Sequence, residues 1–246
     1  MSFSFRKNSD SLTSVTFLIC DELDRAGFLH AFGNRHLPAA TPERFVANLH
    51  PGTWELKLAQ QTHSDIRLHL TDQPPLQGDA LVTAHANILA GVKTADCVPL
   101  LIGDPVTRTA AAVHAGWRGT LKRIAQKTLV DLRDKYGARP EDCIIAIGPH
   151  ACGDCYQIGP EVVAEFQREF SAGKNFFSKF SADGKAFFNG ALANRHQLLE
   201  AGAQAHNIHN AQACTMHQND LYFSHRKEGG AEQPAGRQLS AIGLHG

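Results

Sequence analysis

The sequence predicts a single domain of the α+β (mixed α/β) class, and three observations lead to this prediction. Short, very apolar runs typical of buried strands occur at residues 98–102 and 109–113, and each is stopped by a turn. An amphipathic helix pattern covers residues 120–136. No Ser/Gly-rich linker, charge run or internal repeat divides the 246 residues, so we expect residues 1–246 to share one core.

The first third of the chain is expected to contain a strand pair, a helix and further strands. Residues 15–20 and 27–32 predict two strands at a sheet edge, joined by a polar turn at 21–24. The segment Thr41-Pro42-Glu43 offers an N-cap, a proline at the first helical position and an acidic first turn, which predicts a short helix. Strands are also expected within 54–70, and apolar runs follow at 80–83 and 88–93.

Residues 120–136 form the clearest predicted helix. Apolar side chains recur there at spacings of three and four, Thr120 offers an N-cap and Gly137 marks the end. Arg118 comes just before the predicted N-terminus, and a guanidinium beside free backbone N–H groups predicts an anion site. A buried strand is then expected at 143–147.

The last third is expected to hold two more helices and a final strand. One helix begins at Gly159-Pro160, the other covers residues 189–201, and residues 238–244 are strand-like. Between the helices, residues 171–185 are rich in Phe, Ser, Gly and Lys. We expect a lid or a surface excursion there.

Charge and hydropathy limit the classes of partner and compartment. The 24 Lys+Arg balance 24 Asp+Glu, which gives no electrostatic reason for nucleic-acid or membrane binding and favours a small-molecule or neutral partner. The apolar run at 15–20 is too short for a secretory signal or a membrane span. We therefore expect a cytoplasmic protein whose six cysteines are mostly reduced.

Reactive side chains lie at the ends of the two central apolar runs, and they have two chemical interpretations. His63, Cys97 and His114 together offer two imidazoles and a thiolate, the ligand set of a catalytic zinc ion with an open fourth position. Alternatively, His114 deprotonates Cys97 and Asp96 or another polar group orients the imidazole, as in a cysteine hydrolase. Separations of 34 and 17 residues are not a local ligand motif, so metal content must separate the two.

Several other polar residues are weaker candidates. The pair Cys152-x-x-Cys155, with His150 upstream, is a redox pair, half of a zinc cluster, or two loop cysteines in a wall of the site. We favour the third interpretation, since the sequence has no second C-x-x-C. The remaining candidates are the arginines Arg118, Arg226 and Arg237, of which Arg118 is the candidate for anion binding, and Asp79 and Asn194, types more often found in turns and caps.

Six motifs in the same order resemble the YfiH-like family. They are QTHS (61–64), GDALVT (78–83), TADCVPLL (94–101), AAVHAGWRGT (111–120), IGPHACGDCYQIGPEV (147–162) and FSHR (223–226), the last followed by Gly236-Arg237. Members of this family are variously called polyphenol-oxidase (laccase) domain proteins, peptidoglycan editing factors and purine nucleoside phosphorylases. The resemblance covers nearly the whole chain.

The resemblance implies a fold, a metal site and a substrate class. The fold would be two packed mixed β-sheets with flanking helices, in four α/β/β/α layers. His63, Cys97 and His114 would bind Zn²⁺, with Cu²⁺ as the alternative metal. Purine nucleosides and phosphate would be the partners of a monomer or weak homodimer. The residues expected to contact substrate are Arg118, Asp79, Cys155 and Arg226.

The two implied reactions need different residues for proton transfer and for phosphate binding. Hydrolytic deamination of adenosine needs a metal-activated water and a proton carrier, for which Asp96 is the candidate. Phosphorolysis of adenosine, inosine, guanosine or methylthioadenosine needs a phosphate clamp, which we assign to Arg118 and the N-terminus of the helix over 120–136.

Three alternatives remain. A cysteine hydrolase or amidase that edits peptidoglycan precursors would need no metal. A non-catalytic protein would bind nucleosides without turnover. A copper-dependent polyphenol oxidase ordinarily uses further copper ions held by His-x-His pairs, and no two of the fourteen histidines are two residues apart.

Overall fold

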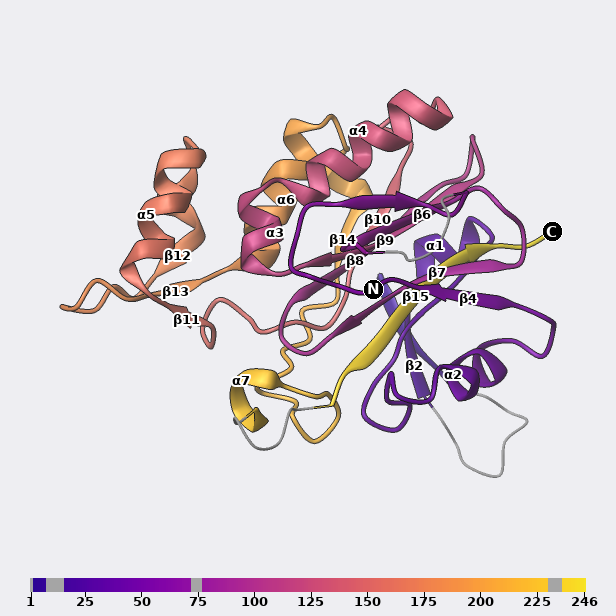
Figure 1. Ribbon diagram of the computed structural model, residues 1–246, viewed down its shortest axis with the longest axis horizontal. Helices are drawn as coiled ribbons and strands as arrows, with labels where there is room; N and C mark the ends of the chain where they lie inside the picture. The colour runs from indigo at the N-terminus through magenta and orange to yellow at the C-terminus, as the bar shows by residue number, and fades with distance from the viewer. Residues whose placement is uncertain (1, 8–15, 72–76, 230–235) are drawn as a thin grey trace.

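Two six-stranded mixed sheets pack face to face in the computed structural model, which describes residues 2–7, 16–71, 77–229 and 236–246 (Figure 1). The first sheet has the order β1 (Phe3–Lys7), β2 (Thr16–Cys20), β3 (Phe28–Phe32), β15 (Gln238–Leu244), β7 (Ile88–Thr94), β4 (Glu55–Leu58). The second has the order β14 (Ile208–Asn210), β10 (Ile144–Ile147), β8 (Val98–Asp104), β9 (Thr109–Ala115), β6 (Ala80–Thr83), β5 (Arg67–His69).

The central strands are buried on both faces, which explains why their sequences are continuously apolar. Every residue of β8, β9 and β15 is buried. Along β8, Leu101 packs between the sheets, whereas Leu100 and Ile102 point to the helices on the outer face. The predicted runs at 98–102 and 109–113 are therefore the middle of the second sheet.

Helices cover both outer faces and complete the predicted four-layer arrangement. α4 (Ile124–Tyr136) and α6 (Gly190–Glu200) pack on the second sheet. α2 (Pro42–Leu49) packs on the first through Phe45, which is fully buried. The polar segment predicted as a turn between β2 and β3 is instead a one-turn helix, α1 (Asp21–Arg25). In the described residues, no helix combines the length and apolar character needed to cross a bilayer.

The predicted helix over 120–136 is interrupted near its start. A short helix, α3 (Trp117–Leu121), ends before Arg123, whose φ of 64° is left-handed and which precedes α4. Thr120 is thus inside α3 rather than an N-cap; its hydroxyl accepts a hydrogen bond from Asn194 Nδ2 at 3.0 Å, which ties α3 to α6. Arg123 is held by Glu169 and Glu200 at 2.9 and 2.8 Å. Gly137 ends α4 in the left-handed conformation, as predicted.

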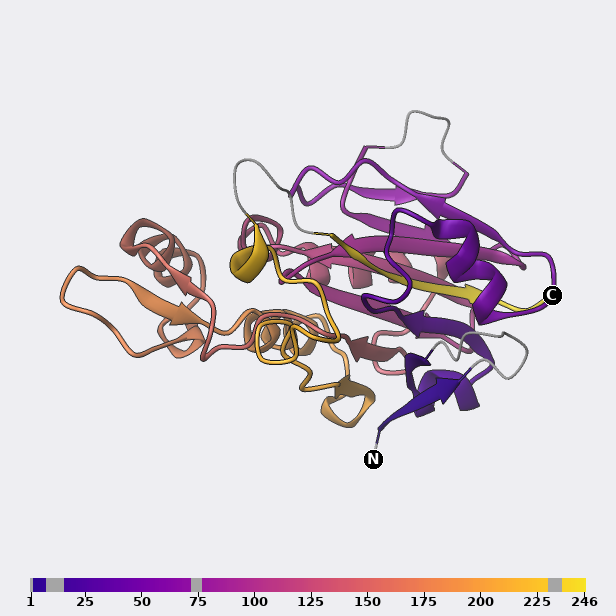
Figure 2. The same ribbon diagram turned by 90° about the horizontal axis from the view of Figure 1, so that it is seen from below.

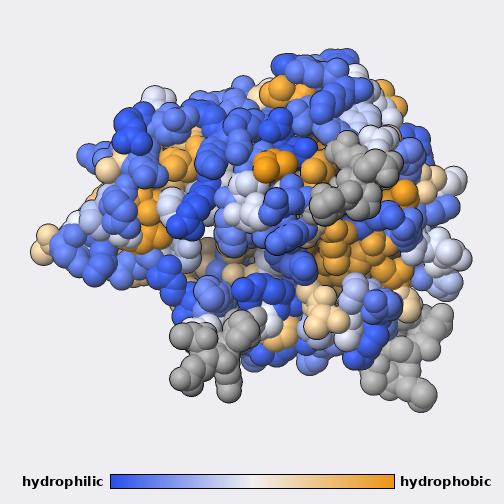
Figure 3. Space-filling model, in the orientation of Figure 1, coloured by the Kyte–Doolittle hydropathy of each residue, from blue (hydrophilic) through white to orange (hydrophobic). Residues whose placement is uncertain are grey.

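A small third sheet, which the sequence did not predict, forms a lobe beside the two main sheets (Figures 1 and 2). It comprises β11 (Gln157–Ile158), β13 (Ala186–Phe188) and β12 (Phe177–Ser178), with α5 (Pro160–Glu169) and a 3₁₀ helix, Gly173–Phe176. Its core is a phenylalanine cluster whose members are Phe166, Phe170, Phe176, Phe177 and Phe188. The segment expected to be a lid or excursion therefore contributes core side chains, although hydrophilic residues surround the hydrophobic ones on the lobe's surface (Figure 3).

Buried His30 makes the stability of this fold depend on pH. Its Nδ1 donates to the Phe28 carbonyl at 3.0 Å, and its Nε2 accepts from the Cys20 N–H at 2.9 Å, so only the neutral ring satisfies both contacts. Burial lowers the pKa of His30 below its usual 6.5. Below about pH 6.5 the unfolded chain takes up a proton that the folded chain does not, which destabilises the fold by at most about 1.4 kcal/mol per pH unit.

We expect the free energy of unfolding to fall between pH 7.5 and 5.5, and to fall less steeply in His30→Gln, which cannot take up this proton. Urea titrations at both pH values measure the two slopes. Equal slopes in the variant and the parent protein would show that His30 does not contribute.

Candidate metal site and active-site cavity

A cavity of about 630 Å³ opens at the ends of β7, β8 and β9. The C-terminal loop, which carries His225 and Arg226 and precedes β15, forms another part of its wall. Its lining is unusually polar for a small-molecule site and combines imidazoles, a thiol, guanidinium groups and two aromatic rings. The lining residues are Gln60, Gln61, His63, Lys93, Ala95, Asp96, Cys97, His114, Trp117, Arg118, Tyr156, His225, Arg226 and Arg237.

His63, Cys97 and His114 converge at this cavity from three separate segments. Each offers one ligand atom, and the three atoms lie within 4.8 Å of one another. The rings of His63 and His114 stand nearly perpendicular, with centroids 4.9 Å apart. The pairing of β8 with β9 places Cys97 beside His114, because Val98 is opposite Ala115 and Pro99 is opposite His114.

The backbone around these side chains is shaped for close approach. His63 and Asp96, the residue before Cys97, have φ values of 58° and 82°, a conformation uncommon for residues other than glycine. A Cβ at Gly116 would lie 3.0 Å from the His63 ring and 3.2 Å from Cys97 Sγ. A glycine at 116 therefore leaves room for the imidazole and the sulfur to meet.

Asp79 fixes the orientation of His114 from beneath the cavity. Its carboxylate is fully buried and accepts His114 Nδ1–H at 2.7 Å, which leaves Nε2 of His114 to face Cys97. The N–H groups of His63 and Ser64 also donate to it, at 3.0 and 2.6 Å. Burial alone would raise the pKa of Asp79, but the hydrogen bonds from His114 and Ser64 hold it well below its usual value.

The Cys97 thiol is placed where it ionises readily. Burial opposes ionisation, but the neighbouring imidazoles of His114 and His63 outweigh it and lower the pKa of Cys97 to about 6. The thiolate is the form that binds metals and attacks carbonyl carbon. Two imidazoles and a thiolate fit both zinc and copper by donor chemistry.

Asp96 lies in the cavity wall with both carboxylate oxygens engaged. Oδ1 accepts from the Thr215 hydroxyl at 2.6 Å, and Oδ2 accepts from the Arg226 N–H at 2.6 Å. Asp96 does not contact the His114 Nδ1, because Asp79 occupies that position. Asp96 therefore orients the C-terminal loop rather than the imidazole.

Arg118 and Arg226 form a cationic wall stacked on aromatic rings. The Arg118 guanidinium lies 4.3 Å from the Trp117 ring centroid, and that of Arg226 lies 4.7 Å from the Tyr156 ring centroid. Arg118 belongs to α3, so the predicted anion site at the N-terminus of a helix over 120–136 is corrected: α4 begins at Ile124. The guanidinium itself still faces the cavity.

Comparison with known proteins identifies the family. The profile described as "Multi-copper polyphenol oxidoreductase laccase" matches residues 38–245. The chain belongs to this family. It is 38% identical to "Adenosine deaminase RL5" from an unknown prokaryotic organism over 71% of each chain. It is 36% identical to a purine nucleoside phosphorylase of Clostridium acetobutylicum over 74% of each chain.

Solved structures confirm the fold of this laccase-family protein. The YfiH protein of Bacillus licheniformis has a TM-score of 0.85 at 24% identity, covering 98% of each chain. YlmD from Geobacillus stearothermophilus has the same TM-score and identity, covering 98% of this chain and 99% of its own. Together with the family match over residues 38–245 and the relatives above, this confirms the resemblance to the YfiH-like family inferred from the six motifs.

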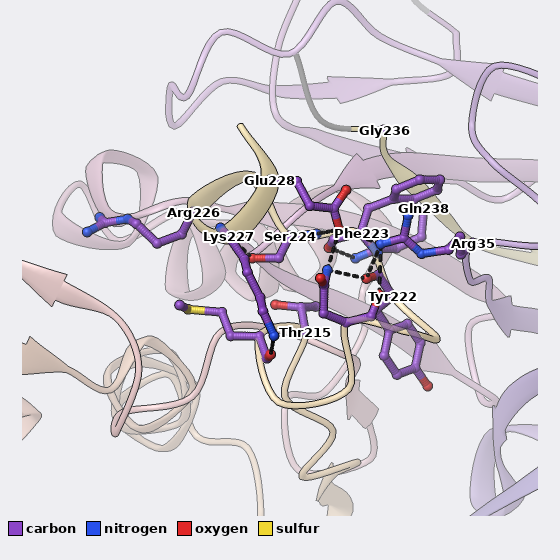
Figure 4. A network of polar contacts seen from close by, with 12 residues as sticks. Arg35, Thr215, Tyr222, Phe223, Ser224, Arg226, Lys227, Glu228, Gly236 and Gln238 are labelled. Carbon is purple, nitrogen blue, oxygen red and sulfur yellow. Dashed lines mark hydrogen bonds and ion pairs between the residues drawn. The ribbon is translucent and has the colours of Figure 1, made fainter. Parts of the chain in front are cut away.

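The C-terminal loop that presents Arg226 is held by polar contacts from distant segments (Figure 4). α7 (His225–Glu228) is capped by the Ser224 hydroxyl, which accepts the Lys227 N–H at 3.2 Å. Glu228 pairs with Arg35, whose guanidinium also donates to the Tyr222 carbonyl at 3.1 Å. Sequence reasoning found Arg226 through FSHR but could not show that Arg35 supports it from 191 positions away.

Two residues expected to contact substrate lie elsewhere, and others were missed. Asp79 is beneath the cavity, and Cys155 is not in its lining; Cys155 Sγ is 3.1 Å from His217 Nε2. Tyr156, Lys93 and His225 do line the cavity. Of these, Tyr156 could have been found from its place beside Cys155 in the CYQIG motif.

Proposed function

We propose that this protein is a zinc-dependent purine nucleoside enzyme. It would catalyse phosphorolysis of adenosine, inosine, guanosine and methylthioadenosine, and hydrolytic deamination of adenosine. The observation that carries this proposal is the convergence of His63, Cys97 and His114 at a cavity whose wall is cationic. The names of the two relatives, an adenosine deaminase and a purine nucleoside phosphorylase, support the substrate class.

His63, Cys97 and His114 would hold the metal, and all three line the cavity. When bound, the ion supplies Lewis-acid chemistry and acidifies water. The chain's own contribution is to keep Cys97 ionised and to fix the His114 tautomer through Asp79.

Proton transfer and phosphate binding would fall to other side chains. Thr215 and the Arg226 N–H hold the Asp96 carboxylate at the cavity wall. There it would accept a proton from water and return it to the departing ammonia in deamination. In phosphorolysis, the Arg118 guanidinium would bind the phosphate that attacks C1′ of the ribose.

The proposed function is tested by product analysis together with elemental analysis of protein purified without added metal. Adenosine alone should yield inosine and ammonia, and adenosine with phosphate should also yield adenine and ribose 1-phosphate. Both should disappear when a chelator removes the metal and return with Zn²⁺. If zinc-loaded protein forms neither set of products, the proposal is refuted.

Removing the carboxylate that orients His114 should weaken the metal site without removing a ligand. We expect Asp79→Asn to lower metal affinity or activity roughly 10- to 100-fold. Asp104→Asn is the matched control, because Asp104 is also fully buried and accepts hydrogen bonds, but from Val106 and Thr107 in the turn after β8. A chelator competition measures the metal affinity of both variants. Equal losses of affinity would mean that the Asp79 effect is a general loss of stability.

Cysteine hydrolase chemistry is the second candidate, since Cys97, His114 and Asp79 also form a nucleophile, base and orienting carboxylate. An amidase acting on peptidoglycan precursors would use this arrangement. It predicts that metal-free protein is active and that thiol alkylation abolishes this activity. The zinc proposal predicts that metal-free protein is already inactive.

Oxidase activity is expected to be weak despite the family's description. One His₂Cys set resembles the ligands of a single copper site, but no two of the fourteen histidines form a His-x-His pair. Oxygen uptake with a phenol substrate should therefore be slow in copper-loaded protein. Vigorous turnover at stoichiometric copper would contradict this prediction.

A further inference from the structure

A second cluster of metal-binding side chains lies outside the active-site cavity. Cys152, Cys155, Cys214 and His217 offer ligand atoms that all lie within 4.8 Å of one another, and none of the four lines that cavity. The sequence showed the first half as Cys152-x-x-Cys155. The structure supplies the second half as Cys214-x-x-His217, which a search for a second C-x-x-C misses.

We infer that these four residues bind a structural zinc ion. Three thiolates and one imidazole, arranged in two pairs with two intervening residues, form a closed tetrahedral ligand set. Bonds of about 2.3 Å from zinc to sulfur space the sulfurs about 3.8 Å apart, which agrees with the observed clustering. The inference rests on this cluster and is independent of the proposed enzymatic function.

The loop carrying the first pair is already folded into a ligand turn. The N–H groups of Cys155 and Tyr156 both donate to the Cys152 carbonyl, at 3.0 and 3.1 Å. A Cβ at Gly153 would lie 2.8 Å from Asn189 Cβ, so the glycine permits the turn to pack closely. The turn thus directs both sulfurs to the same side.

The second pair is held in the same way. Gln218 N–H donates to the Cys214 carbonyl at 2.9 Å, a helical turn that brings Cys214 and His217 onto one face.

Backbone contacts join the two halves without help from a metal. His150 and Cys214 form a parallel β-bridge, in which His150 N–H donates to Ala213 and Thr215 N–H donates to His150, each at 3.0 Å. The Cys152 N–H lies 3.4 Å from the Cys214 sulfur. Across the cluster, Cys155 Sγ is 3.1 Å from His217 Nε2. A simple Cys152–Cys155 redox pair would not require this histidine.

Charge around the cluster suits an anionic complex. Zinc with three thiolates and one neutral imidazole carries one net negative charge. The Lys179 ammonium pairs with Asp154, which lies between Cys152 and Cys155 in the sequence, at 2.7 Å. Lys179 follows β12 in the lobe, so this ion pair links the lobe to the loop that carries Cys152 and Cys155.

The second ion would stabilise the wall of the active-site cavity. Tyr156, which follows Cys155, lines the cavity beneath Arg226. Thr215, which follows Cys214, donates to Asp96 Oδ1 at 2.6 Å. Both segments are anchored by the proposed ligands.

Zinc content per chain tests the inference, measured by elemental analysis after purification without added metal. His217→Ala should contain about one ion fewer than the parent protein, whereas His217→Cys, which restores a fourth ligand, should retain it. Cys143→Ala is the matched control, because Cys143 is a free buried thiol outside both clusters. Unchanged zinc in His217→Ala would overturn the inference, as would a Cys152–Cys155 disulfide found by mass spectrometry of freshly alkylated parent protein.

A second measurement leaves all four ligands of the cluster in place, so a loss of structure caused by replacing a ligand cannot explain its result. In Cys97→Ala the active-site thiolate is gone, and Co²⁺ added to the metal-free protein should still give the thiolate-to-cobalt charge-transfer absorption of a tetrahedral site with three sulfurs. Absence of that absorption would contradict a site at Cys152, Cys155, Cys214 and His217.

Discussion

Replacing Cys97 with alanine is expected to lower kcat/KM for both phosphorolysis and deamination by about a thousandfold. Loss of the thiolate removes one of three protein ligands, and a catalytic metal contributes several kcal/mol of charge stabilisation. About 4 kcal/mol corresponds to about a thousandfold in rate. Steady-state kinetics with adenosine, with and without phosphate, measures both losses, alongside the zinc content of each preparation.

Cys143→Ala provides the control for this prediction as well. Cys143 is fully buried in the core under α4 and α6, so its replacement tests the general cost of losing a buried thiol. It should retain both activities. Full activity of Cys97→Ala with its metal still bound would exclude Cys97 as a ligand and as a nucleophile.

Arg118→Ala is expected to affect the two reactions unequally. A charge-assisted hydrogen bond contributes about 1.5–3 kcal/mol, so the KM for phosphate should rise roughly 10- to 100-fold. Deamination consumes water rather than phosphate and should change far less. Arg118→Lys should recover part of the phosphate affinity, because lysine keeps the charge but loses the planar fork.

The control for Arg118 is Arg44→Ala, which removes an exposed guanidinium from α2 on the opposite sheet. It should leave both reactions unchanged. Equal losses of phosphorolysis and deamination in Arg118→Ala would assign the residue to the common nucleoside site instead of the phosphate.

The two main sheets were largely predictable, because their strands are apolar runs with clear ends. The run at 238–244 coincides with β15, and that at 98–102 lies within β8. The lobe was not predictable in this way. Its strands are two or three residues long, and its phenylalanines follow no single period, because they converge from a helix, a 3₁₀ turn and a hairpin.

The candidate site was only partly predictable from the residues themselves. His63, Cys97 and His114 are far apart in the sequence. The pairing of β8 with β9 places Cys97 beside His114, and His63 comes from a separate segment. The ends of the two apolar runs indicated Cys97 and His114, and the six motifs supported the full set. The role of Asp79 follows from its burial beneath His114, which no local pattern reveals. The break at Arg123 depends likewise on partners in α5 and α6.

The most direct test of the metal site is anomalous diffraction at the zinc absorption edge, from crystals grown without chelator. We predict a peak within about 2.0–2.3 Å of an imidazole nitrogen of His63, Cys97 Sγ and an imidazole nitrogen of His114. A zinc-containing crystal with no peak among these three side chains would contradict it.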